Sequence, residues 1–290
     1  MRHLTDPQES DIHRIVRDRY GEIARTGTPI PEAGCCGPKP ADVAARLGYD
    51  ASETTEAPDG ANLGLGCGAP LRHARLRKGE TVLDLGSGAG FDVFLAAKEV
   101  GEQGRVIGVD MTPEMLQRAR RNAREGEFRN VEFRAGRIEA LPVEDSSVDV
   151  VLSNCVINIV PDKARVYREI ARVLRRDGRM VISDVVLDAP LPEAIASDVA
   201  ALTGCVAGAA LRADCIAAVR TAGLTDIEIV SDRSFGEIAL AMVPDDLLAR
   251  ARAAGIEVEN VASSVRSLTI CARKPAHEKS GCATATGRSE

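Results

Sequence analysis

A glycine-rich turn with two carboxylates near it is the first feature of this sequence that could do chemistry. Residues 82–90 read VLDLGSGAG, so an apolar strand runs into a turn with three glycines. A turn of this kind lets the backbone approach a bound nucleotide closely as it opens the next helix. Asp84 lies two residues before the first glycine, and Asp110 ends the next apolar segment, VIGVD. The pattern therefore predicts a nucleotide-like ligand at the ends of two strands.

The positions of these carboxylates favour S-adenosylmethionine over a dinucleotide. A dinucleotide-binding turn has its third glycine one position later, and a carboxylate at Asp84 would repel a pyrophosphate. The same carboxylate would attract the ammonium group of a methionine moiety. Asp110 lies about 20 residues after the turn, where an acidic side chain can accept hydrogen bonds from both ribose hydroxyls. The residues expected to bind this cofactor are Asp84, Gly86, Gly88, Asp110, Met111, Ile138 and Glu139.

The elements around the turn alternate in a way that predicts its place in the fold. The expected strands are 81–85, 105–109, 131–134, 148–153 and 179–186, and the expected helices are 91–100, 113–124 and 163–174. Such alternation is typical of stacked βαβ units in a mostly parallel sheet. Over roughly residues 76–190 the set resembles the class I S-adenosylmethionine methyltransferases. The resemblance implies an α/β fold, a Rossmann-like sheet with helices on both faces.

Five cysteines lie where small neighbours or the end of a strand would leave a thiol accessible. They are Cys35, Cys36, Cys67, Cys155 and Cys205, and all except Cys155 have glycine beside them. A structural cysteine is more often wedged among large apolar side chains. Cys155 follows an expected strand at the edge where open α/β sheets bind ligands, so its thiol should face the transferred methyl group. The spacings do not fit a preformed zinc site of four cysteines, although scattered ligands stay open.

Taken singly, each cysteine is more often a core residue than a functional one, because free cysteine is among the most buried residue types. Cys215 and Cys271 fit this interpretation, since one lies on an expected helix and the other in an apolar terminal strand. Cys282 lies in a polar tail and has no expected role.

As a set, the cysteines and their flanking residues resemble those of the arsenite methyltransferase family. The matching segments are ANLGLGCG at 61–68, SNCVIN at 153–158, and Cys205 further on. The resemblance extends over about residues 20–275. It implies methylation of arsenite and of methylated trivalent arsenicals by S-adenosylmethionine, with As(III) held by Cys67, Cys155 and Cys205.

An upstream loop cysteine would act as a fourth catalytic thiol, and we favour Cys36 over Cys35 for this role. Leu65 departs from the family, whose members often carry an aromatic residue there that would cover the cofactor. Methyl transfer formally oxidises arsenic, and the resemblance implies that upstream cysteines form a disulfide that thioredoxin or glutathione then reduces. We expect no permanent metal.

The expected chemistry needs positioning more than acid–base groups. Three thiolates around As(III) leave a lone pair that points away from the sulfurs and can attack the sulfonium methyl group. If the two are held in line at near-attack distance, no general base is needed. The histidines are accordingly scattered and form no recognisable acid–base set; they are His3, His13, His73 and His277.

Two other functions stay open. A class I methyltransferase of an organic small molecule, such as a quinone or sterol, would share the fold and the cofactor turn. It would not need Cys67, Cys155 and Cys205 together. A non-catalytic thiol protein that binds arsenic or a metal would not need the cofactor turn. Binding of S-adenosylmethionine separates this last function from both enzymes.

Composition excludes some partners. The 43 acidic and 37 basic residues give a net charge of -6, and aromatic residues are only 3% of the chain. Neither a basic patch for phosphates nor a base-stacking platform is evident, so nucleic acid is not an expected partner. The sequence shows no signal-like N-terminus and no uninterrupted 18-residue apolar stretch, so we expect no membrane partner and a cytoplasmic protein.

Four parts of the chain are expected. Residues 1–75 form an N-terminal extension of helices and loops with thiols, with helices at 7–25 and 41–47 and a loop from there to residue 68. Residues 76–190 form the S-adenosylmethionine-binding domain. Residues 191–275 form a substrate-binding part, with helices at 190–202 and 211–222 and closing strands at 227–230 and 265–271. Residues 276–290 form a disordered tail, because they are polar and aperiodic.

Overall fold

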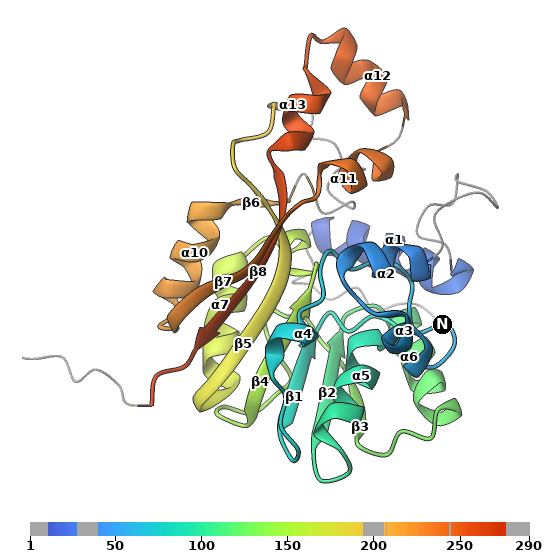
Figure 1. Ribbon diagram of the computed structural model, residues 1–290, viewed down its shortest axis with the longest axis vertical. Coiled ribbons are helices and arrows are strands. Elements are labelled where there is room, and N and C mark those ends of the chain that lie inside the picture. The colour runs from blue at the N-terminus through green and yellow to red at the C-terminus, as the bar shows by residue number, and fades with distance from the viewer. Residues whose placement is uncertain (1–10, 28–39, 194–205, 207, 244, 277–290) are drawn as a thin grey trace, which may run out of the picture.

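The computed structural model describes residues 11–27, 40–193, 206, 208–243 and 245–276. Within these residues an eight-stranded sheet (Figure 1) has the order β3-β2-β1-β4-β5-β8-β7, with β6 paired to β5. The strands are β1 (Thr81–Leu85), β2 (Arg105–Asp110), β3 (Val131–Ala135), β4 (Val148–Asn154), β5 (Leu174–Leu187), β6 (Ala210–Leu211), β7 (Thr225–Ser234) and β8 (Val265–Arg273). Strands β1 to β5 run parallel, whereas β8 is antiparallel to β5 and β7. The carboxyl ends of the parallel strands therefore meet at one edge.

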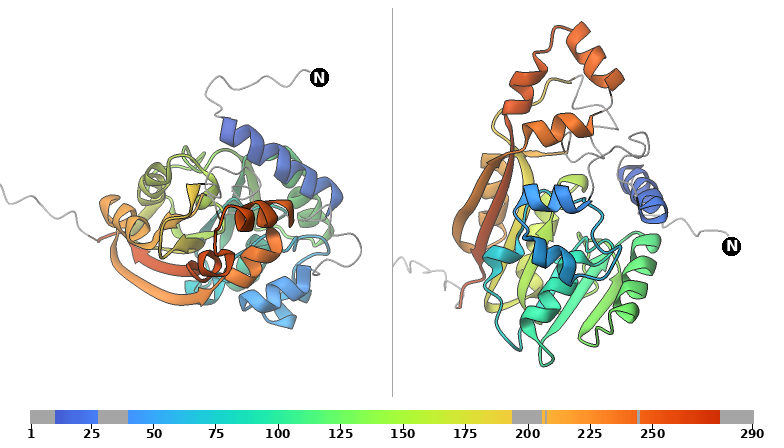
Figure 2. Two further views of the ribbon diagram at one scale, coloured as in Figure 1. Left: turned by 90° about the horizontal axis from the view of Figure 1, so that it is seen from above. Right: turned by 45° about the vertical axis from the view of Figure 1, so that its right-hand side comes forward.

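Helices of the described residues surround the sheet. They are α1 (Asp11–Thr26), α2 (Pro40–Leu47), α3 (Ala51–Glu56), α4 (Leu71–Ala74), α5 (Phe91–Val100), α6 (Pro113–Glu125), the 3-10 helix η2 (Ile157–Ile159), α7 (Lys163–Val173), α10 (Arg212–Thr221), α11 (Gly236–Met242), α12 (Asp245–Ala253) and α13 (Val258–Ser263). Figure 2 shows α11, α12 and α13 beyond one end of the sheet. None of the helices in the described ranges is long and apolar enough to cross a bilayer.

Two apolar layers, one on each face of the sheet, follow from the alternation of side chains along the strands. Val82 and Val150 are fully buried on one face, in a cluster with residues of α5 and α6. Their neighbours Leu83 and Val151 point to the other face and cluster with residues of α7 and α10. This confirms the expected α/β fold, a Rossmann-like sheet with helices on both faces.

The elements expected between residues 81 and 173 are confirmed, with ends shifted by at most one residue. The closing strands are longer than expected. The strand expected from residue 179 begins at Leu174, because the chain between the end of α7 and residue 179 is extended and already part of β5, with Asp177 at a φ of 61°. There the backbone N–H of Asp177 donates to the carbonyl of Lys274, and the N–H of Lys274 donates to Gly178.

Short helices were missed by the sequence analysis. Helix α3 lies in the segment expected as a loop, and it begins where the backbone N–H of Asp50 donates to the Glu53 carboxylate at 2.5 Å. Helices α11 to α13, with seven, nine and six residues, were also not predicted. Most of the helix expected at 190–202 and almost all of the expected tail lie outside the described residues. The division at residues 75, 190 and 275 stays a prediction.

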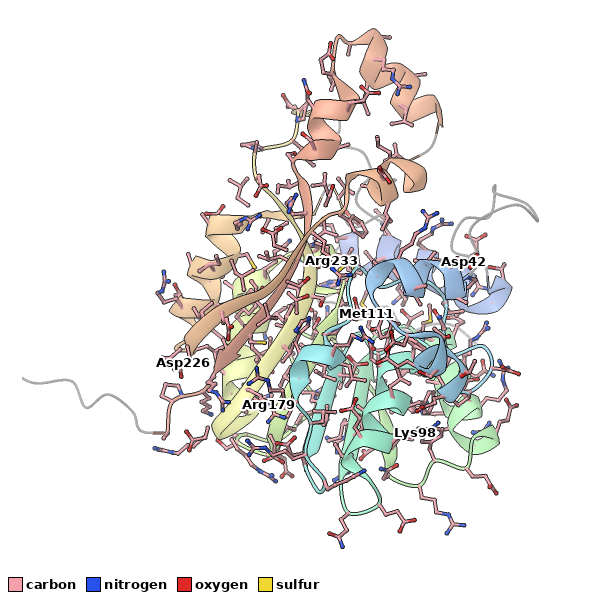
Figure 3. All side chains as sticks on the ribbon, in the orientation of Figure 1. Asp42, Lys98, Met111, Arg179, Asp226 and Arg233 are labelled. Carbon is pink, nitrogen blue, oxygen red and sulfur yellow. The ribbon has the colours of Figure 1, made fainter. Side chains whose placement is uncertain are left out.

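A buried ion pair ties β5 to the start of β1 at the edge opposite the carboxyl ends. The guanidinium of Arg179 (Figure 3) donates to both Glu80 carboxylate oxygens at 2.8 Å. It also donates to the carbonyls of Ala74 and Arg75, so α4 is held by the same group. The two charged side chains are only 14% and 13% exposed. Removing one partner would leave the other charge buried and uncompensated.

We therefore predict that Arg179→Met lowers the free energy of unfolding by about 3 kcal/mol, the usual cost of breaking a buried pair. Urea denaturation measures this free energy of unfolding. Arg175→Met is the matched control, because Arg175 pairs with Asp149 at 2.7 Å but is 48% exposed. That control should lose less than about 1 kcal/mol. Equal losses in the two variants would contradict the prediction.

Candidate functional site

A cavity of about 1100 Å³, its mouth included, lies at the carboxyl ends of β1, β2 and β4. Helix α1 contributes Val16 and Tyr20 to its wall, and the loop before α4 contributes Leu63 and Leu65. Every residue that the sequence analysis expected at the cofactor lines this cavity; they are Asp84, Gly86, Gly88, Asp110, Met111, Ile138 and Glu139. Met111, labelled in Figure 3, follows directly on β2. The structure thus brings together residues from the ends of β1 and β2 and from the segments that follow β1, β2 and β3.

The turn after β1 requires glycine at its first position. Gly86 has a φ of +64°, in the left-handed region that favours glycine. A Cβ atom there would also lie 2.5 Å from the Cγ2 atom of Val156. The turn after β1 therefore packs directly against the residue that follows Cys155, so the glycine-rich turn and the cysteine segment touch.

Asp110 fixes the shape of this turn. Its Oδ2 atom accepts a hydrogen bond from the backbone N–H of Gly88 at 2.9 Å, and its Oδ1 atom accepts one from Thr112 at 2.8 Å. Burial raises the pKa of Asp110, and these backbone N–H groups oppose that rise. Asp110 lines the cavity, where its carboxylate oxygens are acceptors for a ligand's hydrogen-bond donors.

Two further carboxylates make the cavity wall strongly acidic. Asp84 is buried, and burial followed by the charges of Asp92 and Asp110 raises its pKa well above the usual range. Burial also raises the pKa of Asp92, against hydrogen bonds from Tyr49 and Asn154 that lower it. A cation bound here would favour the ionised carboxylates. Asp92 was not predicted from the sequence, where its only signal is its position in the first turn of α5.

Asn154, the last residue of β4, connects this acidic wall to the cysteine loop. Its Oδ1 atom accepts hydrogen bonds from the backbone N–H groups of Cys67 at 3.0 Å and Gly68 at 3.3 Å. Its Nδ2 atom shares two hydrogens among three acceptors, the Gly68 carbonyl at 2.9 Å, the Tyr49 hydroxyl at 3.0 Å and Asp92 at 3.1 Å. One amide therefore sets the position of Cys67 relative to the cavity.

Cys67 and Cys155, predicted from the sequence as arsenic ligands, lie together. Both side chains are buried, and Cys155 lines the cavity. The carbonyl of Ser183 accepts from the Cys67 thiol at 3.4 Å and from the backbone N–H of Cys155 at 2.8 Å. The two sulfur atoms and a carboxylate oxygen of Asp184 all lie within 4.8 Å of one another. Cys155 has a φ of +61°, which is unusual for a residue with a side chain.

Of the other cysteines discussed above, Cys35, Cys36 and Cys205 lie outside the described residues. Cys215 is buried in the core, as expected, and exchanges a hydrogen bond of 3.3 Å with the Tyr167 hydroxyl. Burial raises its pKa to about 11, which keeps this thiol protonated and unreactive. Cys271 is half-buried in β8.

A pairing of His13 with Glu139 was not predicted from the sequence. The Nε2 atom of His13 on α1 lies 2.7 Å from a carboxylate oxygen of Glu139, and both residues are buried. Because 126 positions separate them, no local pattern could have revealed the contact. The pair joins α1 to the segment that lines the cavity, and it occupies a histidine that the sequence analysis had regarded as isolated.

Comparisons with known proteins agree with this geometry. A family model described as a methyltransferase domain matches residues 76–235. The arsenite methyltransferase of Halobacterium salinarum is 51% identical over 77% of this chain and 59% of its own length. That of Aquipseudomonas alcaligenes is 36% identical over 79% of this chain and 67% of its own length. The present chain therefore spans 59% of the Halobacterium relative and about two thirds of the other.

A solved structure shows the same similarity. The crystal structure of an arsenic(III) S-adenosylmethionine methyltransferase from Chlamydomonas reinhardtii superposes with a TM-score of 0.58 and 35% sequence identity. The match covers 82% of this chain and 74% of the algal chain.

From the geometry of the amide, we predict that Asn154→Ala exposes the Cys67 thiol. The loss of the acceptor leaves the N–H groups of Cys67 and Gly68 without this partner, which should also cost about 2 kcal/mol of stability. Maleimide labelling followed by peptide mass spectrometry should show faster modification of Cys67.

Asn130→Ala is the matched control, because this amide also makes two hydrogen bonds to backbone carbonyls, of Ala97 and Gly101, but away from the cavity. It should lose stability without changing the labelling rate of Cys67. An unchanged rate in Asn154→Ala would mean that the loop holds its cysteine without help from β4.

Proposed function

This chain belongs to the arsenite methyltransferase family, and on that basis we propose that it transfers the methyl group of S-adenosylmethionine to trivalent arsenic. The observation that carries the proposal is the pair of buried thiols, Cys67 and Cys155, beside an acidic cavity. Thiolates are the ligands that a thiophilic centre such as trivalent arsenic prefers. We propose Cys205 as the third ligand and Cys36 as the further catalytic thiol.

The charge of the cavity suits S-adenosylmethionine. In the described part of the chain, no lysine, arginine or histidine lies within ion-pair distance of the buried carboxylates Asp84 and Asp92. A ligand with a positive charge would be attracted to these carboxylates, and a pyrophosphate would be repelled.

Each wall of the cavity has a proposed task. Asp84 would attract the ammonium group of the cofactor, and Asp110 would accept the ribose hydroxyls. The backbone of Gly86 and Gly88 lets the cofactor approach closely. Met111, Ile138 and Glu139 would surround the adenine. When bound, S-adenosylmethionine supplies an electrophilic methyl group on a positively charged sulfonium.

The thiols would hold and orient the acceptor. Three thiolates leave arsenic a lone pair directed away from the sulfurs, and Cys155 places one of those sulfurs in the cavity wall. Alignment of lone pair and methyl group then supplies much of the rate enhancement. No proton has to be removed from the arsenic, which agrees with His13 being paired to Glu139 rather than facing the thiols.

Methyl transfer raises arsenic from the +3 to the +5 state, so two electrons must return before the next methylation. We propose that upstream thiols, Cys36 and Cys67 among them, supply these electrons as they close to a disulfide. Thioredoxin or glutathione would then reopen that disulfide by thiol exchange. Neither step calls for a metal.

We predict that Asp110→Ala weakens binding of S-adenosylmethionine by about 1.5–3 kcal/mol, because two hydrogen bonds from ribose hydroxyls to a charged acceptor are lost. Titration calorimetry measures the affinity. Asp188→Ala is the control, since Asp188 is an exposed carboxylate that pairs with Arg212 away from the cavity. Unchanged affinity in folded Asp110→Ala would place the cofactor elsewhere.

The thiol assignment leads to a second prediction. Cys155→Ser and Cys205→Ser should abolish methylation of arsenite and of monomethylated trivalent arsenic, because a serine hydroxyl does not replace a thiolate toward a soft centre. Cys36→Ser and Cys67→Ser should block arsenite but spare the methylated substrate, which has only two positions left for sulfur. Assays with both substrates, read by mass spectrometry of the arsenic products, measure this.

Cys271→Ser is the matched control and should keep full activity, since this thiol lies in β8, half-buried. Full arsenite methylation by Cys155→Ser would contradict the proposal that Cys155 binds arsenic, and it would favour a methyltransferase of an organic molecule. A protein that binds arsenite but not S-adenosylmethionine would instead support the non-catalytic thiol protein.

A further inference from the structure

A third potential ligand lies beside the two thiols at the cavity. A carboxylate oxygen of Asp184 on β5 lies within 4.8 Å of the sulfur atoms of both Cys67 and Cys155, and all three residues are buried. Among the described residues, no other three side chains of histidine, cysteine, aspartate or glutamate converge in this way. The arsenic proposal uses the two sulfurs and leaves this carboxylate without a task.

The backbone holds the Asp184 carboxylate in place without an ion pair. Its Oδ2 atom accepts from the N–H of Asn158 at 3.1 Å, and its Oδ1 atom accepts from its neighbour Val185 at 2.9 Å. Burial raises its pKa to about 7, and Lys163 opposes this only through space. In the described ranges no cationic side chain lies within ion-pair distance of this carboxylate. A buried carboxylate of this kind favours a bound cation.

We propose that Cys67, Cys155 and Asp184 form a site for a thiophilic divalent cation, Zn²⁺ or its analogue Cd²⁺. Two sulfurs and one oxygen are a donor set that zinc accepts, with metal–ligand distances near 2.3 Å for sulfur and 2.0–2.2 Å for oxygen. Donor atoms already within 4.8 Å of one another need only small side-chain movements to reach such a geometry.

The charges of this site favour a cation over a neutral centre. Two thiolates and a carboxylate carry three negative charges, and the cation neutralises two of them. On binding, each thiol loses its proton to solvent, and no oxidation or reduction occurs. Trivalent arsenic forms its complex with sulfur alone and gains little from a carboxylate. Asp184 should therefore strengthen binding of the divalent cation and have little effect on binding of arsenic.

The cation site does not depend on methyl transfer, but one consequence does rest on the proposed function. If arsenic uses the same two thiols, a bound divalent cation excludes it, and the two ligands compete. A protein that binds cadmium without methylating arsenite would keep the cation site and lose the proposed function. A protein that methylates arsenite and shows no cadmium site would keep the proposed function and lose the cation site.

The experiment titrates the full-length, reduced protein with Cd²⁺ and follows the thiolate-to-cadmium charge-transfer absorption, with a competing chelator to set the free ion. Because the remaining cysteines also bind cadmium, each variant is compared with the unaltered chain. Cys155→Ser and Asp184→Asn should each weaken the cadmium site at least tenfold. The controls Cys271→Ser and Asp188→Asn should change it less than twofold.

Arsenite binding to the same variants separates the two ligands. Cys155→Ser should weaken arsenite binding at least tenfold, whereas Asp184→Asn should change it less than twofold. Unchanged cadmium affinity in Asp184→Asn would overturn the proposal. If that variant does not fold, ¹¹³Cd nuclear magnetic resonance of the unaltered protein decides instead. A shift typical of mixed sulfur and oxygen ligands supports the site, and a shift typical of sulfur alone overturns it.

Discussion

The side-chain amide of Asn154 connects three segments that lie far apart in the sequence. Its hydrogen bonds reach the backbone of the loop at Cys67 and Gly68, the hydroxyl of Tyr49 and the carboxylate of Asp92. The amide itself is held at the end of a strand whose preceding residues are almost fully buried. Cys67 therefore takes its position from the sheet rather than from its own segment, and the acidic wall of the cavity is anchored by the same group.

This arrangement joins two chemical environments of opposite character. On the side of β1, buried carboxylates create a site that favours positive charge. On the side of β5, soft sulfur atoms lie beside a single carboxylate. The segment from Asn154 to Val156 separates the two, with the Asn154 amide bonded to both and Cys155 in the cavity wall. Under the proposed function, the methyl donor and the thiophilic acceptor would meet across this segment.

The sequence predicted the part of the fold that repeats with a period. Strands β1 to β4 and helices α5 to α7 show clear apolar spacing, and the cofactor residues follow from glycines and carboxylates next to them. The contacts that complete the site carry no local signal. Asn154 and Asp92 are 62 positions apart, and Tyr49 and Asp92 are 43 apart. In the sequence Asp184 is an ordinary residue of an expected strand, and only the folded sheet shows that it lies beside the two cysteines.

The backbone of Cys155 has a consequence for protein engineering. Its φ of +61° lies in the left-handed region, which costs a residue with a side chain roughly 1–2 kcal/mol and costs glycine little. The chain therefore keeps a cysteine where a more stable fold would have glycine or asparagine. A library selected for heat resistance alone should drift toward those residues at position 155. The selected proteins would be more stable and would lack the Cys155 thiol in the cavity wall.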